Sequence, residues 1–259
     1  MGQYEFHSPT ATDFNDTGSQ ITQGIRFGEF DTIKEELYLL DRSADAPKEK
    51  EVTESIAFQQ GIYDFSQMTG ERIFENRDVV FKFMLFNRKY NLENPNDRIR
   101  FENRIKKLIM PLGVQALYDT HNPTWYLLGK ATGITLSHEE NMNRVTVTLT
   151  FSCYPFMIDS KPESSDIWDN FDFENDIAQE LTYQIAGTES LTLFNVGAAG
   201  VTPEVKTTAA MTVVSSGNQI KLPAGTTTSE LIRLAPGENL LTVTGTGTIS
   251  FDWHKEMMV

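Results

Sequence analysis

Histidine is the residue type that most often marks a metal or acid–base site, and this chain has four. They are His7, His121, His138 and His254. None of them forms an HExxH or another metal-binding spacing with its neighbours. His138 is followed by Glu139 and Glu140, but all three fall in an expected hairpin loop, where charged side chains are ordinarily solvated. The histidines therefore predict neither a catalytic nor a metal site.

Motifs for nucleotide binding and nucleophilic catalysis are also missing. Gly245 and Gly247 lie between apolar runs, with no helix after them to receive a phosphate, so they indicate a turn. No GxSxG elbow occurs. Cys153 is the only cysteine, which excludes an internal disulfide and fits folding in a reducing cytosol. No base stands near it in the sequence, and we interpret it as a small buried side chain in a strand.

The densest group of carboxylates is the tract DIWDNFDFENDIAQE, residues 166–180. Asp166, Asp169, Asp172, Glu174 and Asp176 could together ligate Ca²⁺. Their spacing is not that of an EF-hand, and the glycine of that loop is missing. A solvated linker or an amphipathic segment is therefore the favoured interpretation, with a cation site as the alternative. We predict that the protein uses no metal and no cofactor.

Carbohydrate chemistry is a further alternative. The chain has 36 acidic residues, but nothing in the sequence singles out a pair for glycoside hydrolysis, since such pairs are defined by their spacing in three dimensions. Trp168, Trp253 and Tyr183 could stack on a sugar, although aromatic residues of a core or an interface are the favoured interpretation. We predict that the protein is not an enzyme.

Composition indicates a soluble protein of about two domains. The 259 residues contain 39% hydrophobic and 22% charged residues, and no run approaches the ~20 apolar residues of a membrane span. The first residues lack the pattern of a signal peptide. The net charge is −14, of which the segment 158–259 carries −9. Such acidity argues against a surface that binds nucleic acid or anionic membranes and favours protein partners.

Periodicity predicts a mainly β chain with one helix. The helix is expected over 95–110, with Asn94 as its N-cap and an apolar stripe formed by Phe101, Ile105, Leu108, Ile109 and Leu112. Strands are expected over 79–86, 114–118 and 125–132. The strict alternation of apolar and hydroxyl side chains over 145–152 predicts an antiparallel strand with one buried face, and 134–137 is expected to pair with it across a hairpin.

A shift in composition divides the chain. Residues 1–24 are polar and predict an extended arm, and 25–157 form the first domain. The acidic stretch 158–180 is interpreted as a linker. The remainder, 181–259, is rich in Thr, Gly and Val, with short apolar runs between turn signals, which predicts a β-sandwich.

The order of these elements resembles the distal tail (Dit) protein family of long, flexible-tailed bacteriophages. The segment GIYDFSQMTGERIFENRDVVFKFMLF, residues 61–86, contributes most through Gly61, Asp64, Phe65, Phe74, Asn76, Arg77, Val79 and Phe81. Further similarity comes from the capped helix, from Leu117–Asp119 with Trp125 and Tyr126, and from 145–155 with Cys153 and Pro155. In the second domain it comes from Asn195, Gly197, Pro203, Val205 and the run LAPGEN, residues 234–239.

The resemblance implies a structural virion protein. Family members form a hexameric ring whose N-terminal belt domains continue the tail-tube channel, while galectin-like second domains project outward. The implied partners are further copies of the chain, the major tail tube protein, a tail-associated lysin or fibre hub protein, and receptor-binding or upper baseplate proteins. DNA would pass through the channel without binding the outer surface, and no membrane is involved. The implied location is the tail tip of the virion, assembled in the host cytoplasm.

A ring requires contacts between neighbouring copies, and strand edges and hairpins commonly supply them. We therefore predict a subunit interface at Asn76, Arg77, Ile134, Val145 and Val147. The rival interpretation is a carbohydrate-binding β-sandwich that recognises host cell-wall glycans, which predicts exposed aromatic side chains on one face. A glycan hydrolase is the third, and it predicts two carboxylates facing one cleft.

Overall fold

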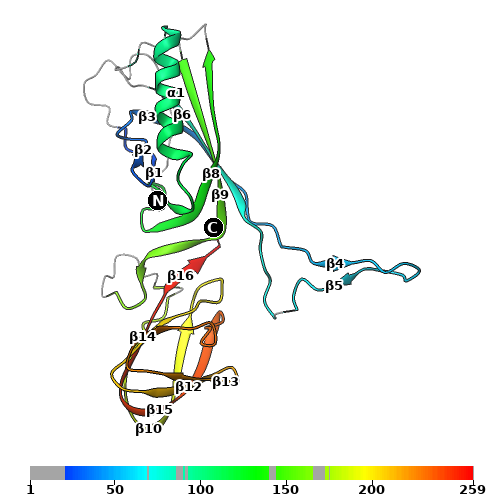
Figure 1. Cartoon of the computed structure of the whole chain (residues 1–259), viewed down its shortest axis with the longest axis vertical. Coiled ribbons are helices and arrows are strands. Elements are labelled where there is room, and N and C mark those ends of the chain that lie inside the picture. Colours follow the sequence, from blue (N-terminus) through cyan, green and yellow to red (C-terminus); the bar gives the residue numbers. More distant parts are fainter. Residues whose placement is uncertain are drawn as a thin grey trace.

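A computed structural model describes residues 21–68, 70–85, 90, 93–139, 144–165, 173–174 and 176–258. Within these residues the chain is mainly β with one helix, as predicted, and all strand pairs are antiparallel. The structure contains an upper body built on a first sheet, a lower body built on a second sheet, and a long arm that projects sideways (Figure 1).

The first sheet has eight strands in the order β2-β1-β7-β8-β9-β6-β3, with β16 also paired to β9. Their bounds are β1 Ile25–Phe27, β2 Phe30–Asp31, β3 Leu37–Ala44, β6 Arg77–Leu85, β7 Gln115–Asp119, β8 Trp125–Glu139, β9 Arg144–Pro162 and β16 His254–Met257. The central strand is β9. One edge of β9 pairs with β8, and the other pairs first with β6 and then with β16.

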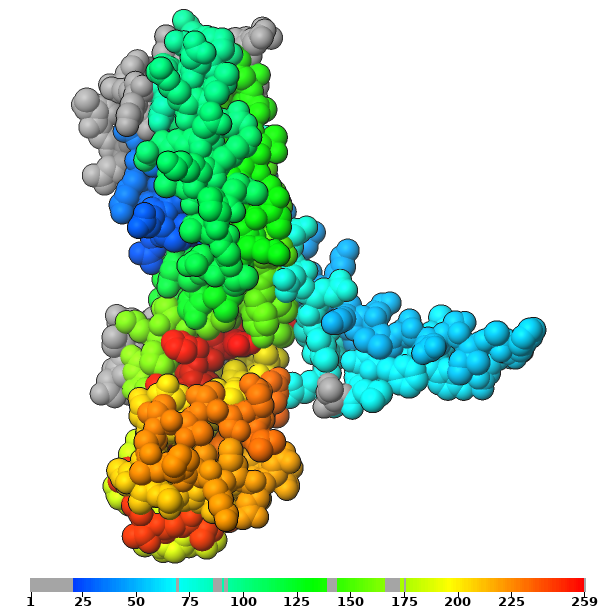
Figure 2. Space-filling model, viewed as in Figure 1, coloured from blue at the N-terminus to red at the C-terminus, as the bar shows by residue number. Residues whose placement is uncertain are grey.

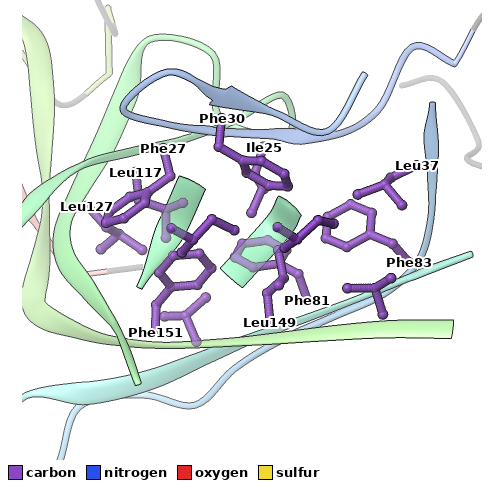
Figure 3. Close-up of a cluster of buried hydrophobic side chains, with 14 of the residues drawn as sticks. Ile25, Phe27, Phe30, Leu37, Phe81, Phe83, Leu117, Leu127, Leu149 and Phe151 are labelled. Atoms are coloured by element: carbon purple, nitrogen blue, oxygen red, sulfur yellow. The ribbon is translucent and has the colours of Figure 1, made fainter. Parts of the chain in front are cut away.

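The sheet folds over a core of aromatic and aliphatic side chains. The rings of Phe27 on β1 and Phe151 on β9 pack edge to face, with centroids 5.0 Å apart, although these strands are not neighbours in the sheet. Figure 3 shows Ile25, Phe27 and Phe30 above Phe81, Leu149 and Phe151. Arg42 on β3 closes the fold through a bidentate ion pair with Asp119 on β7, at 2.6 and 2.7 Å. The alternating pattern of β9 thus buries its apolar face, as the sequence predicts.

The helix α1, Pro95–Ile109, packs on this core. The side chain of Asn94 accepts a hydrogen bond from the backbone of Asn96 at 3.0 Å, which satisfies one of the free amides at the helix start. Phe101, Ile105 and Ile109 are fully buried and continue the core. The predicted helix, its cap and its apolar stripe are therefore confirmed.

The second sheet forms around β15, Gly237–Asp252, and has six strands. The others are β10 Thr182–Asn195, β11 Glu204–Thr207, β12 Met211–Ser215, β13 Asn218–Leu222 and β14 Gly225–Thr228. One edge of β15 pairs with β10, and the other pairs with β12 and then β11. Gly245 and Gly247 lie where the partner changes, with φ of 156° and 136°. The turn predicted there is wrong, because the two glycines bend a continuous strand.

Two features of the path differ from the sequence-based expectation. The strands expected over 125–132 and 134–137 are a single strand, β8, with register shifts between Leu127 and Gly129 and between Ala131 and Gly133. The last strand, β16, follows the whole second sheet in sequence but pairs with β9 of the first sheet. The first sheet therefore takes in two segments that the predicted boundaries place elsewhere. Residues 158–162, expected in the linker, are the end of β9, and residues 254–257, expected in the second domain, are β16. Of the predicted N-terminal arm, residues 1–20 lie outside the described residues.

Candidate functional site

The arm, residues 45–76, runs from the end of β3 to the start of β6 and leaves the body of the molecule (Figures 1 and 2). Two short strands, β4 Thr53–Glu54 and β5 Tyr63–Asp64, pair within it. Closer to the body, the backbone amides of Lys50 and Glu75 donate to Ile73 and Lys48, both at 2.8 Å. The arm is thus a narrow hairpin held by its own backbone hydrogen bonds.

The surface of the arm is unusually apolar. Half of the sixteen large hydrophobic side chains that are exposed in the described part of the chain lie on it. They are Val52, Ile56, Phe58, Ile62, Tyr63, Phe65, Met68 and Ile73. Phe58 is 110% exposed and has a φ of 69°, a conformation that non-glycine residues rarely adopt. A concentration of apolar side chains in solvent is typical of a surface that binds another protein.

The root of the arm is anchored to both bodies. Phe74 packs edge to face on Phe156 of β9, with ring centroids 5.7 Å apart. Arg72 forms an ion pair with Glu49 across the hairpin. Arg233, in the second body, donates to Glu71 at 3.1 Å. These contacts fix the direction in which the arm leaves the molecule.

The five predicted interface residues occupy different environments. Asn76 is exposed at the root of the arm, and Ile134 is half-buried on β8. Arg77, Val145 and Val147 are buried within the chain itself, at 4%, 2% and 0% exposure. Burial lowers the pKa of the Arg77 guanidinium, which lies opposite Cys153 in the strand register. Of the five, only Asn76 and Ile134 present side-chain surface outside the chain, and the subunit interface stays a prediction.

Among the described residues, Cys153 and the histidines lie in separate places. Burial raises the pKa of the Cys153 thiol to about 12, so the thiol is protonated and unreactive at neutral pH. This confirms its interpretation as a buried strand residue. His121 is exposed at a turn, and His138 and His254 lie at the ends of different strands. His7 is outside the described residues.

No group of three potential metal ligands exists among the described residues. Asp166, Asp169 and Asp172 of the acidic tract lie outside them. Asp176 forms an ion pair with Lys255 at 2.7 Å. In the same described part of the chain, no helix is long and apolar enough to cross a membrane.

The aromatic residues expected on a sugar-binding face lie elsewhere. Trp253 is 4% exposed and, with Tyr183, belongs to the core of the second sheet or packs against it. Phe194 is half-buried and Phe251 is buried, so no Phe, Tyr or Trp side chain of residues 176–258 is in the exposed class, whereas Phe173 in the acidic tract is 81% exposed. Trp168 is outside the described residues. The interpretation of Trp253 as a core residue is confirmed, and no stacking platform is formed here.

A second polar cluster, which we call the junction, lies where β16 meets β9. Its ionisable side chains are Asp159, Glu163, Asp176, Lys255 and Glu256, with Tyr154 beside them. Lys255 is 9% exposed and Asp159 2% exposed. Sequence reasoning missed the junction, since its members are separated by up to 102 positions. In the sequence, the one local indication of the junction is that Lys255 is a base between the acids Asp252 and Glu256.

Comparison with known proteins adds one relationship. No profile of a known protein family matches the sequence, and no curated protein sequence matches it. The chain does match solved structures. The fold is that of a two-part β protein of the phage Dit type.

One matching structure is the Dit protein (gp 19.1) of phage SPP1, described as a paradigm of the hub adsorption apparatus in phages that infect Gram-positive bacteria. The TM-score is 0.62 at 13% sequence identity, and the match covers 90% of this chain and 98% of the SPP1 chain. The resemblance inferred from residue patterns therefore holds at the level of the fold.

Proposed function

We propose that this protein is a structural component of a phage tail, a distal tail hub that assembles as a hexameric ring. Its first sheet with α1 would form the ring, and its second, galectin-like body would project outward. Such a hub joins the tail tube to the tail tip and to the receptor-binding or baseplate proteins. Its place would be the virion, after assembly in the host cytoplasm. The fold match over nearly the whole chain supports this proposal.

The observation that carries the proposal is the apolar arm. Phe58 and Ile62 are 110% and 69% exposed in the loop between β4 and β5, and Met68, which follows β5 on the same arm, is 81% exposed. Burying a side chain of this size contributes about 1.5–3 kcal/mol, so a few of them contribute enough to hold a subunit contact. An arm on one copy that reaches the next copy makes a head-to-tail contact, and such contacts close into rings.

The predicted interface residues take a supporting part in this proposal. Asn76 stands at the root of the arm, where a neighbour would pass. Arg77 follows it and is buried at the first position of β6, so it would set the angle at which the arm leaves the sheet. Replacing Arg77 by Ala is expected to impair assembly because it changes the direction of the arm. Arg77 is buried, so the variant removes no contact area from the subunit interface itself.

The test measures assembly directly. Light scattering after size exclusion gives the mass of the wild-type assembly, and negative-stain imaging gives its symmetry. We expect a six-fold ring from the wild type, alone or with its tail partners. The double variant Phe58→Ser/Met68→Ser is expected to remain monomeric, because it removes apolar contact area from the arm only.

The matched control is Leu231→Ser/Leu240→Ser, which replaces two exposed leucines on the second body. It is expected to form rings like the wild type. The proposed hub function would be overturned if the wild type stayed monomeric at every accessible concentration, with and without tail partners. Rings formed by the arm variant, or lost in the control, would overturn the role assigned to the arm.

A further inference from the structure

The junction joins the two bodies by burying charge. Nζ of Lys255 lies 2.7 Å from Oδ2 of Asp176 and 3.9 Å from Oδ2 of Asp159. The register of β16 on β9 is irregular between His254 and Glu256, so Lys255 lies within the irregular step. Two chain segments from different parts of the sequence are thus held to the last strand by one lysine.

Glu163 lies beside this ion pair. Its backbone amide donates to the carbonyl of Trp253 at 2.7 Å, and its Oε1 accepts from Nε2 of Gln179 at 3.3 Å. The Gln179 amide also pairs with both backbone groups of Phe194 on β10. Glu163 therefore sits between the first sheet and the second, with acidic Asp159 and Asp176 as near neighbours.

Glu256 occupies the other side of β16. Its Oε2 accepts a hydrogen bond from the hydroxyl of Tyr154 at 2.8 Å, and its backbone carbonyl accepts from Ala198 at 2.6 Å. Arg233 of the second body lies close enough to influence the carboxylate. Strand β16 is therefore bonded on one side to the first sheet and on the other to the second body.

The charges of the junction do not balance. Asp159, Glu163, Asp176 and Glu256 contribute four carboxylates, while only Lys255 is buried among them as a cation. Arg233 lies at the rim, half-exposed, and also bonds Glu71 of the arm. Asp159 is buried and Glu163 and Asp176 are half-buried around Lys255, so these three carboxylates repel one another as long as all are ionised. Glu256, half-buried on the other side of β16, loses hydration there.

We propose that the junction is a proton-sensitive clamp, in which Glu163 and Glu256 take up protons on mild acidification and thereby tighten the contact between the two bodies. The clamp lies within one chain, so it does not depend on the ring. The second body would be held more rigidly to the first below neutral pH than above it. Through Arg233, the same would hold for the arm.

The direction follows from linkage. Burial raises the pKa of Glu163, and Asp176 and Asp159 add to the rise while Gln179 and Lys255 oppose it. Burial also raises the pKa of Glu256, against the opposing effects of Tyr154 and Arg233. A carboxyl whose pKa is higher in the closed junction than in the open one binds a proton more tightly when closed. Closing is therefore favoured as the pH falls through the raised values and weakened as it rises through them.

Other titratable groups face the same region and must be accounted for. Nδ1 of His254 donates to the carbonyl of Asp159 at 2.7 Å, and Tyr126 lies near Glu256 and Asp159. Asp252 accepts from the backbone of Ser164 at 3.2 Å. Histidines as a class change charge between pH 5 and 8, so His254 requires its own control.

The experiment is hydrogen exchange of the whole protein at pH 7.5 and 5.5, corrected for the intrinsic rate at each pH. Peptides covering β16 report the junction, and peptides covering β12 serve as the internal reference. In the wild type, protection of β16 relative to β12 is expected to rise about threefold or more at the lower pH. In Glu163→Gln/Glu256→Gln it is expected to be high at both pH values, since both side chains are then permanently neutral.

Two control variants decide the assignment. Glu29→Gln/Glu238→Gln makes the same change in net charge at exposed positions of the two bodies, and it should respond to pH like the wild type. His254→Asn should also keep the response. A response that survives in Glu163→Gln/Glu256→Gln would overturn the clamp. So would a response that disappears in His254→Asn or in the surface control.

Discussion

The arm and the junction are built in opposite ways. The arm places apolar side chains in solvent, whereas the junction places charged side chains in the interior. Each arrangement is unfavourable for a single side chain taken alone. The junction compensates for part of this cost within the chain, through the Lys255 ion pairs and the Tyr154 hydrogen bond. Within the described residues of one copy, the exposed side chains of the arm have only the stacking of Tyr63 on Phe65, and the subunit contact proposed above would bury the others.

This difference separates internal from external contacts. A variant in the junction should change the stability of the single chain, while a variant on the arm should change only what the chain binds. The two regions are also connected, since Arg233 belongs to the surroundings of Glu256 and bonds Glu71 of the arm. Variants in each region therefore test whether a change in the junction alters the arm.

The largest effect on the single chain is expected from Lys255→Met. The change leaves Asp159 and Asp176 without their buried cation, and breaking a buried pair in this way costs about 3–5 kcal/mol. Chemical denaturation of the variant and the wild type measures the difference. A loss of less than about 1 kcal/mol would show that water reaches the junction and that its charges are screened.

A smaller and pH-dependent effect is expected from Tyr154→Phe. The variant removes the hydroxyl that donates to Glu256, which costs about 1–3 kcal/mol when the acceptor is a buried carboxylate. Because burial raises the pKa of Glu256, the loss should be greater at pH 7.5 than at pH 5.5, where protonation removes part of the charge. Denaturation curves at the two pH values check this, and equal losses would contradict it.

The connection between the regions is tested by Arg233→Ala. Arg233 and Glu71 are both partly exposed, so the ion pair contributes only about 0.2–1 kcal/mol to stability. Its effect on the arm should be easier to detect. Hydrogen exchange at residues 48–50 and 73–75 is expected to become faster, while exchange in α1 stays the same. Unchanged exchange at the root of the arm would mean that Phe74 alone anchors it.

The smallest effect on the single chain is expected from Phe58→Ser. The ring of Phe58 is fully exposed, so its loss should leave the denaturation midpoint of the monomer unchanged within error. A lowered midpoint would show that Phe58 packs against its own chain. In that case the contrast between the arm and the junction would not hold.

Much of the first body could be predicted from the sequence because its signals are local. The cap at Asn94 and the apolar stripe of α1 lie within a few turns, and the alternation in β9 needs only neighbouring residues. The arm could not be predicted in this way. Its apolar residues follow neither a helical nor a strand period, because no core selects one face of it.

The junction was beyond local pattern reading for a different reason. Lys255 and Asp159 meet only because β16 returns to β9 after the entire second sheet, and no feature of residues 254–257 indicates that partner. The bend at Gly245 and Gly247 was misinterpreted for a similar reason. Glycines with positive φ are typical of turns, but here β12 pairs on one side of the bend and β11 on the other, so the strand continues.

The return of β16 to β9 also has a consequence for synthesis. Glu256 leaves the ribosome 102 residues after Tyr154, which corresponds to a delay of roughly 5–20 seconds at about 5–20 residues per second. During that delay, the edge of β9 that later receives β16 has no strand beside it from the same chain, while the second sheet is being made. The ribosome must therefore synthesise the whole second sheet before the first sheet can receive its last strand.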